Sequence, residues 1–260
     1  MDILQKNFYD NFPIGTITSK KELESYVRDQ FSDISPISLA WRLFDLKNAG
    51  YIQDLGNKKF KVVDKNDSRS FGMKIDSKLL DFLDQYNRRL SSDRQSRYGI
   101  DPRISIWETS VLNQFMVHQI YKNYVVIEVD ESRIDNLFFQ MKESFKNVVP
   151  LSRIKGFDYF SYMLENIIII QKLPKRSPLY ANRKTNNVSV PKPEKILVDI
   201  LAINEELLNI DQSEILNIYK RMIKEYRVSI TTLLSYARIR GTITRNKVQN
   251  ILSVIGVYEP

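Results

Sequence analysis

The sequence predicts a mixed α/β (α+β) protein in two parts, a small helical module that ends in a hairpin and a larger domain behind it. Helix start and stop signals dominate the first 64 residues. Two apolar runs typical of buried strands, YVVIEV and IIIIQK, occur in the middle of the chain, and helical periodicity prevails after residue 191. A chain of 260 residues is long enough for two domains. The predicted division is a helical module at 1–64, a linker at 65–75, and a mixed α/β domain with a helical C-terminal tail at 76–260.

The composition predicts a globular protein of the cell interior. Hydrophobic residues make up 43% of the chain, which suits a protein with a core. Cysteine is absent, and this excludes a disulfide framework and a thiolate metal site. The N-terminus lacks the basic and then apolar pattern of a secretory signal, and the most apolar run, IIII at 167–170, is too short to span a bilayer. We therefore expect a cytoplasmic protein with no membrane partner.

The charge of the chain favours a polyanionic partner. The net charge is +8, and lysine and arginine gain affinity for nucleic acid by releasing counterions from phosphates. The alternative is a basic protein with no nucleic-acid role. Residues 1–64 hold nine Lys and Arg against nine Asp and Glu, so the N-terminal module is neutral. A DNA-binding face in this module therefore requires that its positive and negative charges be segregated.

Three helices are predicted in the N-terminal module. The first covers 3–12. An S-x-x-E capping box at 19–22 starts the second, which runs to about residue 31. Ser35 caps the third, which has proline at its first position, and Gly50 is placed to end it in the left-handed conformation.

A hairpin follows the third helix. YIQDL and KKFKVV flank the pair Gly56-Asn57, and a Gly-X pair in a two-residue loop suits a type II′ turn. Three helices followed by a hairpin give the winged helix-turn-helix arrangement, in which the third helix enters the major groove and the wing lies along the DNA backbone. The candidate DNA-binding residues are Ser38, Trp41, Arg42 and Asp45 in the third helix and Lys58, Lys59 and Lys61 in the wing.

These residue types suit contacts with DNA. Arg42 can bind guanine bidentately, Ser38 can bind a phosphate near the start of its helix, and the wing lysines can contact the sugar-phosphate backbone. The alternative is that the module docks a protein and that Trp41 packs against neighbouring residues. A neutral module also leads us to expect a homodimer or paired sites on DNA, which gather more contacts.

The larger domain is predicted to alternate strands and helices. Asp76 can cap a helix from about 77 to 90, and Ser132 can cap one that runs to about 146. The other predicted elements are a short strand at 103–106, a helical turn at 108–116, strands at YVVIEV, VVPL and IIIIQK, and helices at 192–203, 212–226, 229–239 and 244–254.

No residue pattern of an enzyme is found in the sequence. His118 is the sole histidine, and a structural role is favoured over a catalytic one because a lone titratable group needs a positioned partner. The chain has no P-loop, no G-x-G-x-x-G and no G-x-S-x-G, so we expect no cofactor and no catalytic residue. The alternative is a magnesium-dependent nuclease that uses Glu108, Glu128 and Asp130, although the lysine of a D/E-x-K pair is missing at this strand.

Basic residues recur near the C-terminus, at Arg238, Arg240, Arg245 and Lys247. Such a helical face is usually solvated, but it can also bind RNA or an acidic partner.

Two strings give the chain a resemblance to a known family: W-x-T-x-x-L-N-x-F-x-x-H-Q from Trp107 to Gln119 and P-x-x-E-K-x-L-V-D from Pro191 to Asp199. With AWRLFDLKNAGYI, YVVIEVD and SITTLLSYARIRG, they resemble the AbiEi-type antitoxins, which are regulators of viral defence. The resemblance implies a bacterial type IV toxin–antitoxin system. In that family an N-terminal winged helix represses the operon by binding promoter repeats, and a C-terminal domain counters a nucleotidyltransferase-like toxin, which need not form a stable complex with it. The wing departs from many relatives, since it is short and closes with Gly-Asn.

The expected function is therefore that of a DNA-binding transcriptional autorepressor and antitoxin. The four basic C-terminal residues are the candidates for antagonism of the toxin. A metal-dependent nucleic-acid-processing enzyme with a winged-helix targeting domain is the alternative, and a protein-interaction adaptor is a third.

Overall fold

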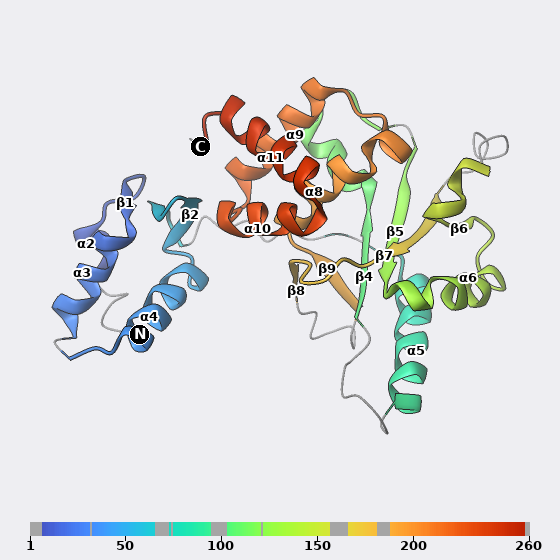
Figure 1. The fold of residues 1–260 in the computed structure, drawn as a ribbon, viewed down its shortest axis with the longest axis horizontal. Helices are drawn as coiled ribbons and strands as arrows, with labels where there is room; N and C mark the ends of the chain where they lie inside the picture. Colours follow the sequence, from blue (N-terminus) through green and yellow to red (C-terminus); the bar gives the residue numbers. More distant parts are fainter. Residues whose placement is uncertain are drawn as a thin grey trace.

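The computed structural model describes residues 7–31, 33–65, 73, 75–94, 103–120, 122–156, 166–180 and 188–257. It confirms the mixed α/β class. Figure 1 shows a small N-terminal module on one side of the C-terminal helices and a sheet on their other side. Three hydrophobic clusters form the core, one inside the N-terminal module and one on each face of the larger sheet.

In the part of the N-terminal module that the structure describes, three helices combine with a three-stranded antiparallel sheet. The helices are α2 (Phe8–Asn11), α3 (Lys20–Gln30) and α4 (Pro36–Asn48), and the strands β1 (Ile17–Ser19), β2 (Ile52–Gly56) and β3 (Lys59–Val62) lie in the order β1-β3-β2. The short strand β1 was not predicted. The first predicted helix is only one turn long within the described residues, and its proposed start before residue 7 lies outside them. That this module works as a winged helix-turn-helix stays a prediction.

The predicted helix caps are confirmed. Ser19 Oγ accepts from the N–H of Glu22, and the Glu22 carboxylate accepts from the N–H of Ser19 at 2.6 Å. Ser35 Oγ accepts from the N–H of Ser38 at 3.1 Å. Gly50 adopts φ +80°, and the N–H groups after the helix return to carbonyls of its last turn, so the left-handed end is also confirmed.

The hairpin turn differs from the prediction. Gly56 pairs with Lys59, so the two loop residues are Asn57 and Lys58, which both have positive φ (48° and 59°). This is the backbone of a type I′ turn, not the predicted II′ turn at Gly56-Asn57. The physical reason is a bulge between Asp54 and Gly56, where the Asp54 carboxylate accepts from the Gly56 N–H at 2.8 Å and moves the turn by one residue.

The larger domain is built on a six-stranded sheet of mixed direction with strand order β6-β7-β5-β4-β9-β8. Strand β5 pairs antiparallel with β4, and β8 pairs antiparallel with β9, whereas the remaining neighbours are parallel. The strands are β4 (Ile104–Glu108), β5 (Tyr124–Val129), β6 (Val148–Pro150), β7 (Ile167–Lys172), β8 (Leu179–Tyr180) and β9 (Val188–Pro191). Strands β8 and β9 were not predicted, and the burial of β5 on both faces agrees with its apolar sequence.

Helices cover both faces of this sheet (Figure 1). Helices α5 (Ser77–Arg94) and α6 (Ile134–Lys142) pack on one face with Val125 and Ile127 of β5. The C-terminal helices α8 (Pro193–Ile203), α9 (Gln212–Glu225), α10 (Ile230–Arg240) and α11 (Thr242–Val254) cover the other face with Tyr124 and Val126. Because side chains alternate along a strand, Glu128 shares the face of Tyr124 and Val126 and points toward α8.

The caps and the other predicted elements of the larger domain are mostly confirmed. Asp76 Oδ1 accepts from the N–H of Leu79 at 2.9 Å, and the helical turn after β4 is a 3₁₀ helix, η1 (Thr109–Phe115). The predicted cap at Ser132 is wrong, because Asp130 Oδ1 accepts from the N–H of Ser132 and starts a 3₁₀ turn, after which α6 ends at Lys142 and not at residue 146. Among the helices that the structure describes, none has the length and apolar character needed to cross a lipid bilayer.

Candidate functional site

Five exposed lysines gather around the tip of the β2–β3 hairpin. The pairing of β1 with β3 places Ser19 opposite Lys59, and the N–H of Lys20 donates to the carbonyl of Lys58 at 2.8 Å. The start of α3 therefore lies beside the hairpin turn, and Lys20 forms an ion pair with Glu24 at 3.4 Å. We call these residues the hairpin lysine cluster: Lys20, Lys21, Lys58, Lys59 and Lys61.

Charge along α3 is mixed, because Glu22 lies in its first turn with Lys20 and Lys21, and Arg28 lies in its last turn. The helix begins at Lys20 and Lys21, and the exposed acidic residues Asp29 and Asp33 lie at and beyond its other end. Eleven residues of α-helix separate these ends by about 16 Å. The basic surface of this neutral module is therefore the hairpin together with Lys20 and Lys21, where Glu22 and Glu24 offset part of the positive charge.

Helix α4 presents an apolar stripe to solvent. Ile37 is 74% exposed, Trp41 60% and Phe44 50%, and the rings of Trp41 and Phe44 lie 5.5 Å apart in a T-shaped pair. Ser38 and Asp45 are also exposed. Trp41 is therefore not part of the core of the module.

Arg42 does not lie free on this surface. The residue is half-buried, and its guanidinium stands 4.8 Å above the centre of the Phe31 ring. Of the seven predicted DNA-binding residues, Ser38, Trp41 and Asp45 lie on the exposed face of α4, and the three wing lysines lie at the hairpin. The side chain of Arg42, by contrast, lies between α4 and the end of α3.

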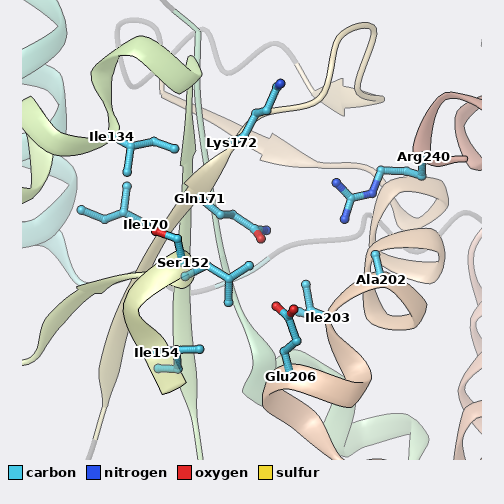
Figure 2. Close-up of a pocket in the computed structure, with 11 residues that line it drawn as sticks. Ile134, Ser152, Ile154, Ile170, Gln171, Lys172, Ala202, Ile203, Glu206 and Arg240 are labelled. Atoms are coloured by element: carbon cyan, nitrogen blue, oxygen red, sulfur yellow. The ribbon is translucent and has the colours of Figure 1, made fainter. Parts of the chain in front are cut away.

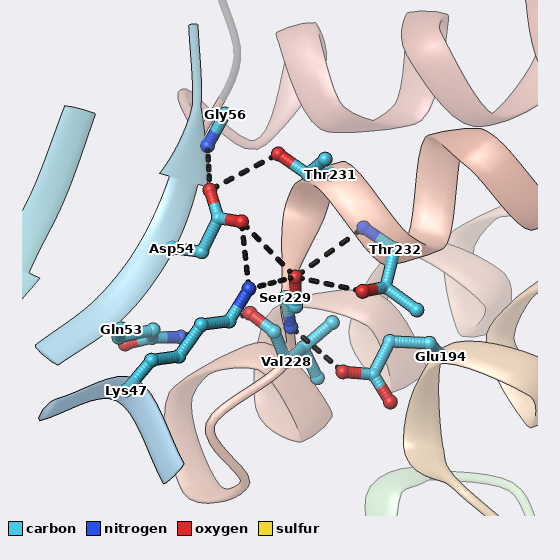
Figure 3. A network of polar contacts seen from close by, with 9 residues as sticks. All are labelled: Lys47, Gln53, Asp54, Gly56, Glu194, Val228, Ser229, Thr231 and Thr232. Atoms are coloured by element: carbon cyan, nitrogen blue, oxygen red, sulfur yellow. Dashed lines mark hydrogen bonds and ion pairs between the residues drawn. The ribbon is translucent and has the colours of Figure 1, made fainter. Parts of the chain in front are cut away.

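A network centred on Asp54 joins the N-terminal module to α10 (Figure 3). Asp54 is 6% exposed, and its carboxylate accepts from Lys47 Nζ at 2.9 Å and from the Gly56 N–H. Ser229 Oγ and Thr231 Oγ1, at the start of α10, donate to the same carboxylate at 3.2 and 3.1 Å. Burial raises the pKa of Asp54, but the hydrogen bonds and Lys47 outweigh burial, so the net shift of this pKa is downward.

Other contacts join the module to the chain just before α10. Arg227 Nη1 donates to the carbonyl of Gly50 at 2.7 Å, and its other terminal nitrogen donates to the carbonyl of Asp64. Gln53 donates to the carbonyl of Val228 at 3.4 Å. Gly50 has φ +80°, which favours glycine, and a Cβ there would lie 1.9 Å from Arg227 Nη1, so the Arg227 side chain would also have to move. Helix α10 therefore begins where the two parts of the chain meet.

Three fully buried charges lie between the sheet and α8, and we call Glu128, Lys195 and Asp199 the buried charge cluster. Lys195 Nζ is 2.7 and 2.6 Å from the two oxygens of Glu128, and it also pairs with Asp199 one helical turn away. Tyr236 OH donates to Asp199 Oδ1 at 2.9 Å, and Gln171 donates to Glu128 at 3.3 Å. Every charge of the cluster thus has a partner of opposite sign, as buried charges require.

Burial and mutual attraction shift the pKa values of this cluster. Burial raises the pKa of Glu128 more than the attraction of Lys195 lowers it, so the net shift is upward. Burial lowers the pKa of Lys195, but Asp199 and Glu128 outweigh it and raise the pKa overall. Burial also raises the pKa of Tyr236, so its hydroxyl stays protonated and donates. The lysine is therefore charged, and it occupies the space between the two carboxylates that a metal ion would need.

A cavity of about 480 Å³ lies beside this cluster (Figure 2). Arg240, the last residue of α10, has its Nε 3.3 Å from Asp199 Oδ1. Figure 2 shows the guanidinium of Arg240, the amide of Gln171 and the carboxylate of Glu206 facing the same space. Leu151, Ile154 and Ile203 supply an apolar wall on this side of the sheet.

The carboxylates of the nuclease alternative do not meet. Glu108 pairs with Val125 and Glu128 with Ser105, so they lie at opposite ends of the β4–β5 pair, and Asp130 caps the turn after β5. Within the described ranges no group of three or more His, Cys, Asp or Glu side chains could hold a metal ion.

His118 contacts Glu214 at the start of α9. Its Nδ1 is 3.0 Å from Glu214 Oε1, and the N–H groups of Val117 and His118 donate to the same carboxylate at 3.0 and 2.9 Å. These backbone N–H groups lower the pKa of Glu214 to about 2. The contact fixes the end of the W-x-T-x-x-L-N-x-F-x-x-H-Q string against α9.

The four basic C-terminal residues do not form one patch. Arg238 and Arg245 are exposed, whereas Arg240 points to the cavity. Lys247 pairs with Glu205 at 3.1 Å and lines a separate groove between α8, α9 and α11.

Several residues of these sites were missed in the sequence. Lys20 and Lys21 join the hairpin through strand β1, which is too short to give a signal. Asp54 and Ser229 are 175 positions apart. A signal for the buried charge cluster was present, since Lys195 and Asp199 are four residues apart in a mostly apolar helix and Glu128 interrupts an apolar strand.

The model of one protein family, described as a family of unknown function (DUF6577), matches residues 38–256. The matched part includes the hairpin, the network around Asp54, the buried charge cluster and the cavity. A comparison with curated proteins finds no match.

Proposed function

We propose that this chain, which belongs to the DUF6577 family, is a DNA-binding transcriptional autorepressor whose larger domain acts as an antitoxin. The N-terminal module binds promoter DNA, and the hairpin lysine cluster supplies contacts to the phosphate backbone. The observation that carries the first half of the proposal is this cluster, because five lysines at one end of a neutral module form the electrostatic footprint of a nucleic-acid-binding surface.

Helix α4 is the proposed groove-facing element. Its exposed face offers Ser38 and Asp45 as polar groups and Trp41 as an apolar one. Apolar side chains contact thymine methyl groups in the major groove, and an aspartate can accept from cytosine N4. Arg42 acts indirectly in this proposal, because its stacking on Phe31 orients α4 against the end of α3.

The second half of the proposal concerns the larger domain. The resemblance to AbiEi-type antitoxins supports a role in which this domain counteracts a nucleotidyltransferase-like toxin, with or without a stable complex. The proposed state on DNA is a homodimer on promoter repeats, since one neutral module offers few phosphate contacts. The proposed location is the cytoplasm.

Binding of labelled duplexes, measured by fluorescence anisotropy, tests the DNA-binding half. One duplex carries the repeats upstream of the chain's own operon, and the other is a random sequence of equal length. The variant Lys58→Gln, Lys59→Gln, Lys61→Gln should weaken binding to both duplexes alike, because phosphate contacts carry no sequence information. Trp41→Ser should reduce the preference for the promoter duplex.

The matched control is Lys220→Gln, Arg221→Gln, Lys224→Gln, which removes the same charge from the exposed side of α9. It should bind DNA as the parent chain does. If the control loses as much affinity as the hairpin variant, the interaction reflects net charge alone, and the assignment of the hairpin is refuted.

Co-expression with the product of the neighbouring gene tests the antitoxin half. A chain that restores growth when a nucleotidyltransferase-like toxin is induced supports the proposal, and the hairpin variant should restore growth equally well because it leaves the larger domain intact. Continued growth arrest in the presence of the folded chain would contradict it.

A further inference from the structure

The cavity beside the buried charge cluster has the charge pattern of a site for a small zwitterion. Arg240 and Glu206, a cation and a carboxylate of its lining, face the same space in Figure 2. Lys172 also lines the cavity, but its Nζ is paired with Glu131 at 2.5 Å. Arg240 and Glu206 are therefore the opposite charges that a bound molecule would meet.

Arg240 forms an ion pair with a buried carboxylate. The Nε of its guanidinium lies 3.3 Å from Asp199 Oδ1, and the side chain is 20% exposed. Asp199 is itself fixed by Lys195 and by the hydroxyl of Tyr236. The contact with Asp199 is an ion pair without hydrogen-bond geometry at Nε. The terminal N–H groups of a guanidinium suit a planar partner, and a carboxylate fits them bidentately.

Acceptors for a positive group lie across the same space. Gln171 is 6% exposed, and its Nε2 donates to Glu128 at 3.3 Å, which leaves the amide oxygen to accept. Glu206 adds a full negative charge. An ammonium group seated here would have one ionic and one neutral acceptor.

The rest of the cavity is apolar. Leu151, Ile154 and Ile203, which belong to the same hydrophobic cluster, line it on the side of Arg240 and Glu206, and its volume of about 480 Å³ lies in the range of small-molecule sites. A ligand that satisfies all three walls carries a carboxylate, an ammonium and an apolar side chain.

We infer that this cavity binds a small amino-acid-like zwitterion with an apolar side chain, its carboxylate on Arg240 and its ammonium on Glu206 and Gln171. A doubly charged phosphate fits less well, because Asp199 already balances part of the charge of Arg240 and Glu206 would repel a second anion. The inference does not depend on the proposed DNA-binding or antitoxin role.

Isothermal titration calorimetry on the full chain tests the site. The probes are L-leucine, L-isoleucine, L-valine and L-methionine at millimolar concentration. For leucine, 4-methylpentanoate lacks the ammonium and 3-methylbutylamine lacks the carboxylate, so each removes one of the two charges. At least one amino acid should bind, and both analogues of leucine should bind more weakly than leucine itself. The absence of binding by all four amino acids would overturn the inference.

Two substitutions with matched controls locate the binding. Arg240→Gln and Glu206→Gln should each weaken binding by about 10- to 100-fold, the range for a lost hydrogen bond to a charged group. Arg238→Gln and Glu205→Gln change neighbouring residues that do not line this cavity, and they should bind as the parent chain does. Because Arg240 contacts Asp199, circular dichroism must first show that each variant is folded, and Glu206→Gln provides an independent test on an exposed residue. Unchanged affinity in folded Arg240→Gln and Glu206→Gln would place the ligand elsewhere and refute the site.

Discussion

Replacement of Lys195 by methionine should destabilise the larger domain by about 3–5 kcal/mol, the range for removal of one partner from a buried ion pair. Lys195 is fully buried and contacts both oxygens of Glu128, at 2.7 and 2.6 Å, as well as Asp199. Methionine is also long and unbranched and leaves little empty space, so the cost comes from Glu128 without its cation and from Asp199 with Arg240 alone. Such a loss is a large share of a typical total stability of about 5–15 kcal/mol.

Guanidinium chloride unfolding provides the assay, followed by the fluorescence of Trp107, which is fully buried on β4, in a Trp41→Phe background. The loss should shrink as the pH falls toward 4, because protonation of Glu128 removes one of the uncompensated charges. A companion variant, Lys195→Met with Glu128→Gln and Asp199→Asn, should recover most of the stability, since neutral amides keep acceptors for Gln171 and Tyr236. A cost below about 1 kcal/mol for Lys195→Met alone would refute the reasoning, because Lys195 would then not compensate its neighbours.

Three more results are expected. Asp54→Asn should lower the free energy of unfolding by about 2 kcal/mol at neutral pH, because the hydrogen bonds lose a charged acceptor. Since the pKa of Asp54 is lowered in the folded chain, the difference in urea unfolding midpoint between this variant and the parent chain should vanish as the pH falls through that pKa. Glu214 has a pKa of about 2, below its ordinary 4.5, so its contribution to stability is present above pH 4.5 and is lost toward pH 2. The unfolding midpoints of Glu214→Gln and of the parent chain should therefore converge over this interval. A constant difference would contradict the assignment of the shift to the backbone N–H groups. Promoter DNA should protect the exposed Trp41 from fluorescence quenching by iodide, whereas the buried Trp107 is not accessible to iodide with or without DNA. Unchanged quenching of Trp41 would exclude α4 from the DNA interface.

Local signals in the sequence predicted much of the fold. The capping box at Ser19, the cap at Ser35 and the glycine at position 50 define helix ends through contacts within a few residues, so they can be read without tertiary structure. The hairpin turn could not be placed correctly because the bulge at Asp54 depends on a side-chain contact with the backbone. Strands β1, β8 and β9 are two to four residues long, which is too short for periodicity to show.

The sites were harder to predict because they join distant segments. Glu128 and Lys195 are 67 positions apart, and they meet only because β5 and α8 pack face to face. The sequence placed Arg42 on the surface of α4 by helical periodicity, but it gave no indication of the stacking on Phe31 that occupies its guanidinium. The exposure of the wing lysines was predicted correctly, because lysines at a hairpin turn point to solvent whatever packs against the rest of the hairpin.

The salt dependence of promoter binding tests the central claim most directly. For the parent chain, the logarithm of the binding constant should fall linearly with the logarithm of salt concentration, and each phosphate contact contributes about −0.9 to the slope. The Lys58, Lys59, Lys61 variant should have a slope that is shallower by about 3, whereas the α9 control should keep the parental slope. A hairpin variant with the parental slope would show that these lysines do not contact the DNA backbone, and it would contradict the account.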